Sequence, residues 1–215
     1  MGFAGTLIRS TRKARNLSQR ELSQRAEVPQ SRVSLAETDR ESPRFEMVSR
    51  LLAGAGHRLF AAPTVRDDVA CTASRIREAL AVDDLDAAAA AFLALSADLS
   101  AERGLVRGVL TITEPEPCGA KTWDAALAAL VAYRLAEDGV PPPTWVHAAN
   151  RRMHRARTLP LDPSTDLPAD VPAEFIAHGV LVSRELLDRA QSSADPFSDS
   201  EPRSPTGPSA KGNAI

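Results

Sequence analysis

Short apolar spacings and helix-start signals mark a pair of short helices near the start of the chain. Ser18 precedes Glu21 by three residues, the spacing of a capping box, in which each side chain accepts a hydrogen bond from the other residue's free backbone N–H. Leu22 and Ala26 then lie four residues apart and share one helix face. The pattern predicts a helix that starts after Ser18 and packs through Leu22 and Ala26.

A second short helix is predicted after a turn at Glu27 and Val28. Pro29 can stand at its start, because a backbone N–H has no helical partner there. Val33 and Ala36 point inward. Five side chains are left for the outer or flanking faces: Gln30, Ser31, Arg32, Ser34 and Leu35. Two helices, a tight turn and a polar second helix together indicate a helix-turn-helix, whose second helix enters the major groove of DNA.

In the rest of the chain, apolar residues recur mainly at the spacing of a helix. The clearest stripe of 3.6-residue period comprises Leu85, Ala89, Phe92, Leu95 and Leu99. Asp83 or Asp84 can cap that helix, and Thr122 is expected to cap another. Predicted helices cover residues 65–82, 85–99, 122–135, 146–155, 173–178 and 183–191. Residues 105–112 fit an apolar helix or a strand, and residues 57–62 fit a strand or an extended connector.

These elements predict an all-α, mainly helical chain with minor short strands and two domains. We assign residues 1–62 to the helix-turn-helix domain and residues 63–192 to a helical C-terminal domain for dimerisation or for binding a partner or effector. Residues 193–215 are rich in Ser, Pro, Gly and Asp. Such a segment cannot bury enough apolar surface to order, so we expect a disordered tail.

Charge is divided unevenly along the chain, which has a formal net charge of −2. Residues 1–66 hold 12 Lys or Arg against 6 Asp or Glu, whereas residues 67–215 hold 14 against 22. A weakly acidic whole therefore contains a basic N-terminal part. A basic excess that coincides with the helix-turn-helix pattern is what phosphate contact requires.

Residues 6–59 resemble the DNA-binding domain of the Cro/phage-repressor (xenobiotic-response-element) family. The matching positions are Arg12, Leu17-Ser18-Gln19, Glu21-Leu22, Val33-Ser34, Glu37, Pro43, Met47-Val48 and Leu51-Leu52. The resemblance implies a lambda-repressor-like bundle of about five short helices. It also implies an ion pair between Arg12 and Glu37, although the two residues could instead be unrelated surface charges.

The same resemblance assigns DNA contacts position by position. It places base readout at Gln30, Ser31, Arg32, Ser34 and Leu35, where Gln can pair with adenine, Arg with guanine, and Leu35 can touch a thymine methyl or pack against the next helix. It places phosphate contacts at Gln19, Arg40 and Arg44, although solvated surface arginines are the alternative for the last two.

Three residues depart from the family pattern. Glu27 stands where a glycine is usual, so a left-handed backbone there would cost roughly 1 kcal/mol or more. Pro29 replaces the usual Ser or Thr cap, which leaves one helix-end donor without a side-chain partner. Asp39 replaces another common glycine, but Asp tolerates that conformation better than most residues. These changes bear on stability and helix orientation more than on DNA contact.

Residues for catalysis, metal binding or a cofactor do not form a persuasive pattern. His147, His154, His178 and Cys118 lack the tight ligand pairs of structural metal sites. We therefore expect no enzyme activity, no metal and no cofactor. No apolar stretch is long enough to cross a bilayer and the N-terminus does not resemble a signal peptide. Cys71 and Cys118 are far apart, so we expect a reduced, cytoplasmic protein.

Partners follow from the family resemblance. It implies double-stranded operator DNA, generally palindromic, bound by a homodimer that acts as a transcriptional regulator, in our prediction a repressor of its own operon. Residues 123–145 with residues 175–187 are weakly similar to C-terminal regions of bacterial toxin–antitoxin regulators. This suggests an antitoxin whose C-terminal half covers a toxin. The alternative is a ligand-sensing regulator of the same type without a toxin.

Overall fold

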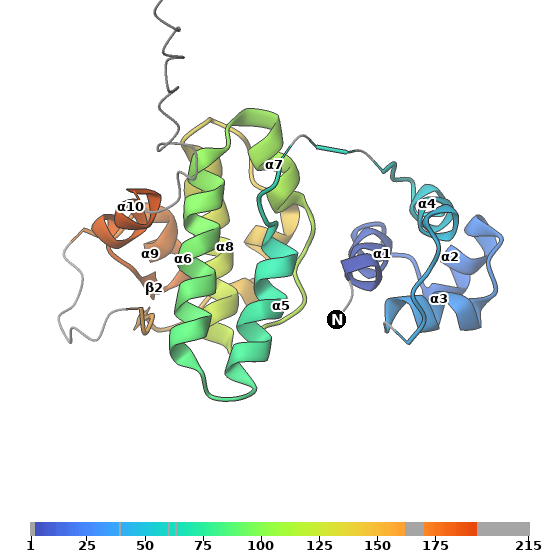
Figure 1. Ribbon diagram of the computed structural model, residues 1–215, viewed down its shortest axis with the longest axis horizontal. Coiled ribbons are helices and arrows are strands. Elements are labelled where there is room, and N and C mark those ends of the chain that lie inside the picture. Colours follow the sequence, from blue (N-terminus) through green and yellow to red (C-terminus); the bar gives the residue numbers. More distant parts are fainter. Residues whose placement is uncertain (1–2, 39, 60, 63, 162–169, 193–215) are drawn as a thin grey trace, which may run out of the picture.

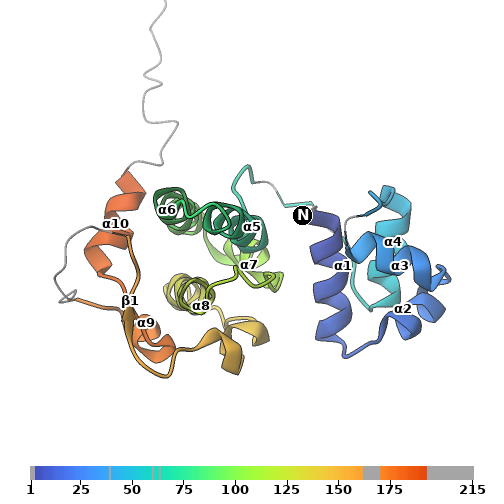
Figure 2. The same ribbon diagram turned by 90° about the horizontal axis from the view of Figure 1, so that it is seen from below.

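The computed structural model describes residues 3–38, 40–59, 61–62, 64–161 and 170–192. The chain is mainly helical, with two short strands among the described residues, which confirms the predicted fold class. Figures 1 and 2 show an N-terminal group of helices beside a larger C-terminal group. Buried apolar residues of the two groups form two separate clusters, one within residues 8–55 and one within residues 69–187.

Four helices form the N-terminal bundle: α1 (Phe3–Ala14), α2 (Gln19–Ala26), α3 (Gln30–Glu37) and α4 (Phe45–Gly54). Ile8 of α1 and Leu51 of α4 are fully buried between the helix pair that the sequence predicted. The four residues expected to face inward are all buried: Leu22, Ala26, Val33 and Ala36. Their spacing was sufficient to identify the packed faces of α2 and α3.

The bundle has four helices in its described residues, where about five were expected. After α4 the chain turns at Gly56, whose φ of +75° lies in the left-handed region. The described residues between α4 and α5 (Val69–Leu80) then contain no strand or helix, so of the two expectations for 57–62 the connector is the one observed. Helix α5 packs mainly on the second cluster, because Val69, Ala73 and Ile76 are buried there.

The C-terminal part is arranged around α8 (Figure 2). Its elements are α5, α6 (Leu85–Ala101), α7 (Gly104–Ile112), α8 (Lys121–Ala136), the 3₁₀ turns η1 (Thr144–His147) and η2 (Ala149–Arg151), β1 (Arg157–Thr158), α9 (Ala173–His178), β2 (Val180–Leu181) and α10 (Arg184–Ser192). Every residue from 123 to 131 of α8 is buried. Helices α5, α6, α7 and α9 all pack on α8, and β1 pairs in parallel with β2.

Several predicted caps and elements are confirmed, and one cap and one helix are wrong. Asp84 caps α6 by accepting a hydrogen bond from the N–H of Ala87 at 2.9 Å. Thr122 does not cap α8, because it lies inside the helix and Ala120 occupies the cap position without a side-chain bond. The helix predicted at 146–155 does not form: two 3₁₀ turns, η1 and η2, end at Arg151, whose side chain is buried. The 105–112 segment is helical, and the expected tail at 193–215 lies outside the described residues.

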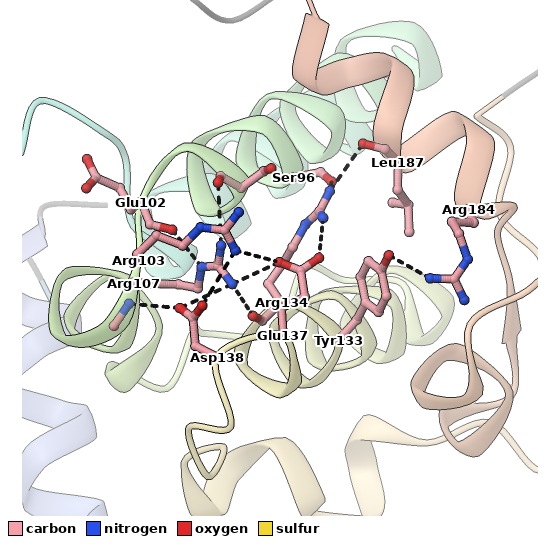
Figure 3. A network of polar contacts seen from close by, with 12 residues as sticks. Ser96, Glu102, Arg103, Arg107, Tyr133, Arg134, Glu137, Asp138, Arg184 and Leu187 are labelled. Atoms are coloured by element: carbon pink, nitrogen blue, oxygen red, sulfur yellow. Dashed lines mark hydrogen bonds and ion pairs between the residues drawn. The ribbon is translucent and has the colours of Figure 1, made fainter.

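Buried arginines join the helices of the C-terminal part (Figure 3). Arg107 of α7 donates to the main-chain oxygen of Arg134 and, at 2.9 Å, to the carboxylate of Glu137. Arg134 of α8 donates to Ser96 Oγ at 3.0 Å and to the main-chain oxygen of Leu187 at 3.2 Å. Both guanidinium groups are fully buried. Their bonds hold α6, α7, α8 and α10 together at one end of the bundle.

Candidate nucleic-acid interface

The start of α2 is fixed by a complete capping box. Ser18 Oγ accepts the N–H of Glu21 at 3.1 Å, and the Glu21 carboxylate accepts the N–H of Ser18 at 2.7 Å. These backbone and side-chain hydrogen bonds lower the pKa of Glu21. The capping box therefore fixes the first turn of α2, and Gln19 is the first residue of that turn.

The turn between α2 and α3 contains the departures expected from the sequence. Glu27 has φ 53° and ψ 41°, a left-handed conformation for a non-glycine residue. Val28 is buried and so anchors the turn in the core. Pro29 occupies the cap position of α3 without a side-chain hydrogen bond. Asp39, the third departure, lies outside the described residues.

An ion pair between α1 and α3 holds the second helix in place. Arg12 Nε and Nη2 donate to the two oxygens of Glu37 at 2.6 and 2.8 Å. Gln19 Nε2 donates to the same carboxylate at 2.9 Å. Burial by itself raises the pKa of Glu37, but the hydrogen bonds from Arg12 and Gln19 outweigh it and the pKa is lowered. One buried carboxylate thus joins α1, α2 and α3.

The N-terminal half of α3 presents polar side chains to solvent. Gln30, Ser31 and Arg32 are exposed, Ser34 is half-buried and Leu35 is 37% exposed. Because Val33 and Ala36 are fully buried beneath them, α3 lies on the surface with its packing face fixed. The side chains expected to contact bases are therefore accessible from one helix, as major-groove readout requires.

The expected phosphate contacts flank α3 from two elements. Gln19 is half-buried at the start of α2, and its amide already donates to Glu37. Arg40 and Arg44 are exposed in the segment between α3 and α4, and Arg44 occupies the cap position of α4. Positive charge thus stands beside the exposed end of the helix pair, where it can contact the DNA backbone.

Two residues near α3 were not singled out by sequence reasoning. Glu41 accepts a hydrogen bond from Arg32 Nη1 at 2.6 Å, with both side chains partly exposed. Arg9 donates to the main-chain oxygen of Glu37 and forms an ion pair with Glu116 of the C-terminal part at 3.0 Å. Arg9 precedes Arg12 by three residues, so a shared α1 face could have indicated its proximity to Glu37. Glu41 left no such signal, because a loop brings it to α3.

The remaining titratable candidates occupy structural positions. His178 is buried and its Nδ1 lies 2.9 Å from the main-chain oxygen of Arg151, and burial lowers its pKa. Burial raises the pKa of Cys118 to about 12, which favours the thiol. Within the described ranges, no three His, Cys, Asp or Glu residues are grouped closely enough to hold a metal ion. None of the helices described is long and apolar enough to cross a membrane.

Comparison with known proteins identifies the N-terminal bundle. Residues 8–55 match the family model described as "Helix-turn-helix". No curated protein and no solved structure matches the chain. The matched residues run from Ile8 in α1 to Ala55 after α4, and so include the capping box, the turn, the exposed α3 and the Arg12–Glu37 pair. Residues 8–55 of this chain are a helix-turn-helix DNA-binding domain of the Cro/C1 type.

Proposed function

We propose that the protein is a sequence-specific transcriptional regulator that inserts α3 into the major groove of operator DNA. The observation that carries this proposal is the exposed polar half of α3 on a helix pair held by the Arg12–Glu37 bonds. A rigid support matters because base contacts depend on side-chain positions fixed to a fraction of an ångström.

Base readout is assigned to the exposed side of α3, and phosphate contact to the residues that flank it. Arg32 is the strongest candidate for a bidentate bond to guanine, and Gln30 for adenine. Ser31, Ser34 and Leu35 complete the reading face. The phosphate contacts assigned beside it are Gln19, Arg40 and Arg44. Before DNA binds, Arg32 is held by Glu41, whose carboxylate orients the guanidinium.

The regulator is proposed to have two domains and to act as a homodimer on a palindromic operator, in the manner of a repressor of its own operon. The division at residue 62 is supported by the two separate apolar clusters. A two-fold pair of domains would place two α3 helices in successive major grooves, about 34 Å apart. The C-terminal part would then set the distance between them.

Binding of the full-length protein to the DNA upstream of its own gene, compared with a scrambled duplex at near-physiological salt, tests this function. A specific regulator should prefer its own DNA by about a thousandfold or more. Equal binding to both duplexes would contradict sequence-specific regulation. A titration of salt should accompany both measurements, because phosphate contacts alone give affinity that falls steeply with salt for any sequence.

For residues 63–192 we propose contact with a second protein, in the sense of an antitoxin that covers a toxin. The alternative proposal is a small-molecule sensor of the same regulator type. Co-expression with the neighbouring gene product and purification of the pair tests the first assignment. Recovery of the regulator alone, together with DNA binding that changes on addition of a metabolite, would favour the second.

A further inference from the structure

Helix α7 has an apolar face that the described parts of the chain leave uncovered. Leu105, Val109 and Ile112 are 83%, 41% and 66% exposed. They follow one another at spacings of four and three residues, so they share one side of the helix. The opposite side is packed, because Arg107 and Leu110 are buried against the bundle. A continuous exposed apolar helix face, rather than scattered apolar residues, marks an interaction surface.

Gly108 lies within this face, and no packing contact among the described residues explains why a glycine stands there. Apart from its chain neighbours and its own helix backbone, no described atom lies within 4 Å of the place where a Cβ would stand. A glycine inside a helix lowers helix stability by roughly 0.5–1 kcal/mol relative to alanine. The missing side chain is explained if a second backbone approaches α7 closely from outside.

The face is complementary to itself when a second α7 is laid across it in the antiparallel direction. A two-fold axis near Gly108 and Val109 brings Leu105 of one copy opposite Ile112 of the other. Leu105 and Ile112 then meet each other across the axis, and Val109 of each copy lies over Gly108 of the other. Gly108, at the centre, has no side chain and so allows the two helices to approach closely.

Charge at the two ends of α7 fits the same arrangement. Arg103 directly precedes the helix and is 67% exposed, and Glu114 follows its end and is 38% exposed. An antiparallel pair places Arg103 of each copy beside Glu114 of the other. Within its own chain Arg103 lies 3.5 Å from Asp138 and 3.7 Å from Glu137, and Glu114 lies 3.7 Å from Arg151. A guanidinium has five N–H donors, and a carboxylate accepts several hydrogen bonds. Each group can therefore accommodate the additional partner across the axis.

We propose that the α7 face, made of Leu105, Gly108, Val109 and Ile112, binds the same face of a second copy of this chain across a two-fold axis. A two-fold contact uses one surface patch on both subunits, which the register of α7 permits. The pairing would allow the dimer to present two α3 helices to a palindromic operator, and this role rests on the proposed function. The contact itself is measured without DNA.

Sedimentation velocity tests this pairing. The full-length protein and variants with opposite charges introduced on α7 are measured over a wide concentration range. Leu105→Glu and Ile112→Lys should each weaken the dimer by roughly tenfold or more, because each places two charges opposite apolar side chains. The double variant should return to within roughly threefold of the original protein, since Glu at 105 then faces Lys at 112 of the other copy.

Ile176→Lys is the matched control, because Ile176 is 61% exposed on α9, away from α7. It should leave dimerisation unchanged. Circular dichroism of every variant verifies that the helices are retained, as expected for exposed positions.

Three results would overturn the proposal: a protein that stays monomeric at all concentrations, a dimer insensitive to both single substitutions, or a double variant as weak as the singles. A monomer that binds the neighbouring gene product through α7 would likewise show that the face belongs to another protein. The DNA experiment is independent. Loss of sequence preference with an intact α7 dimer would contradict only the proposed function, and preference retained by a monomer would contradict only this pairing.

Discussion

Glu37 shows how much one side chain can determine in a small bundle. Its carboxylate is 2% exposed and accepts bonds from α1 and α2 while it belongs to α3. A buried carboxylate that loses its charged partner, or its own charge, leaves polar groups uncompensated. The position of α3 therefore depends on the ionisation of Glu37, which is not among the proposed DNA contacts.

Glu37→Gln should lower the free energy of unfolding of the N-terminal bundle by roughly 3 kcal/mol at neutral pH, because the partly buried Arg12 loses its counter-charge inside the bundle. Since the folded-state pKa of Glu37 is lowered, its ionic stabilisation is complete above the unfolded-state pKa and is lost as the pH falls through the folded-state pKa. Urea unfolding followed by circular dichroism across acidic pH measures both effects. Glu46→Gln, at an exposed position of α4, is the control. An equal loss in both variants would contradict the role of Glu37.

Arg32→Ala should weaken binding to operator DNA by roughly 1–3 kcal/mol and leave binding to random DNA nearly unchanged, because a guanine contact carries sequence information. Fluorescence anisotropy with the two duplexes measures the difference. Equal losses on both would show that Arg32 contacts phosphate instead.

Arg44→Ala and Gln19→Ala should weaken binding to both duplexes alike and lower the slope of affinity against salt by about 1 for the arginine. Because Gln19 also donates to Glu37, its variant should lose some stability that Arg44→Ala retains. A change in sequence preference without a change in overall affinity would contradict the phosphate role of either residue.

At the scale of elements, local signals located helices well where the chain itself satisfies the helix ends. The capping box at Ser18 and the cap at Asp84 both form as the sequence predicts, because their partners lie three residues away. The start of α8 was predicted to within one residue, but the expected cap at Thr122 was wrong. There the chain enters the helix with no side-chain cap, and the buried Asp124 accepts the N–H of Cys118 instead. Such contacts depend on a fold already in place.

The turn between α2 and α3 retains a strained residue that substitution can relieve. Glu27→Gly should raise the free energy of unfolding by roughly 1 kcal/mol, because glycine adopts the left-handed conformation without steric cost. Asn16 has the same φ of 53° but is a residue that tolerates this region, so Asn16→Gly should give a smaller gain. Chemical denaturation of both variants provides the comparison. A gain no larger at Glu27 than at Asn16 would contradict strain at the turn.

At the scale of the whole molecule, the two separate apolar clusters predict that the two parts unfold as two units.

The two parts are joined by few contacts. An ion pair between Arg9 and Glu116 links α1 to the C-terminal part, and α1 packs lightly on α5. Figure 2 shows that the C-terminal part approaches the bundle on the α1 side, with α2 beyond it. Helices α2 and α3 can thus remain accessible while the second part is attached.

Leu51→Ala should destabilise only the N-terminal bundle, by roughly 2–5 kcal/mol, because Leu51 is fully buried there. Both tryptophans, Trp123 and Trp145, lie in the C-terminal cluster, so their fluorescence reports that part alone. The Leu51 variant should shift part of the circular dichroism transition and leave the fluorescence transition unchanged. Leu127→Ala should shift the fluorescence transition. A fluorescence change in the Leu51 variant equal to that in circular dichroism would show one cooperative unit.

The sequence alone determined the helix pair, its inward residues and its resemblance to a DNA-binding family, because caps and apolar spacings act over three or four residues. It also indicated that the rest of the chain is helical. Only the tertiary structure decided that Arg107, Arg134 and Arg151 are buried, since arginine is ordinarily exposed and its partners here come from distant elements. The same holds for the exposed face of α7, whose apolar pattern reads like that of any packed helix. Whether such a face is covered depends on which neighbours the fold brings to it.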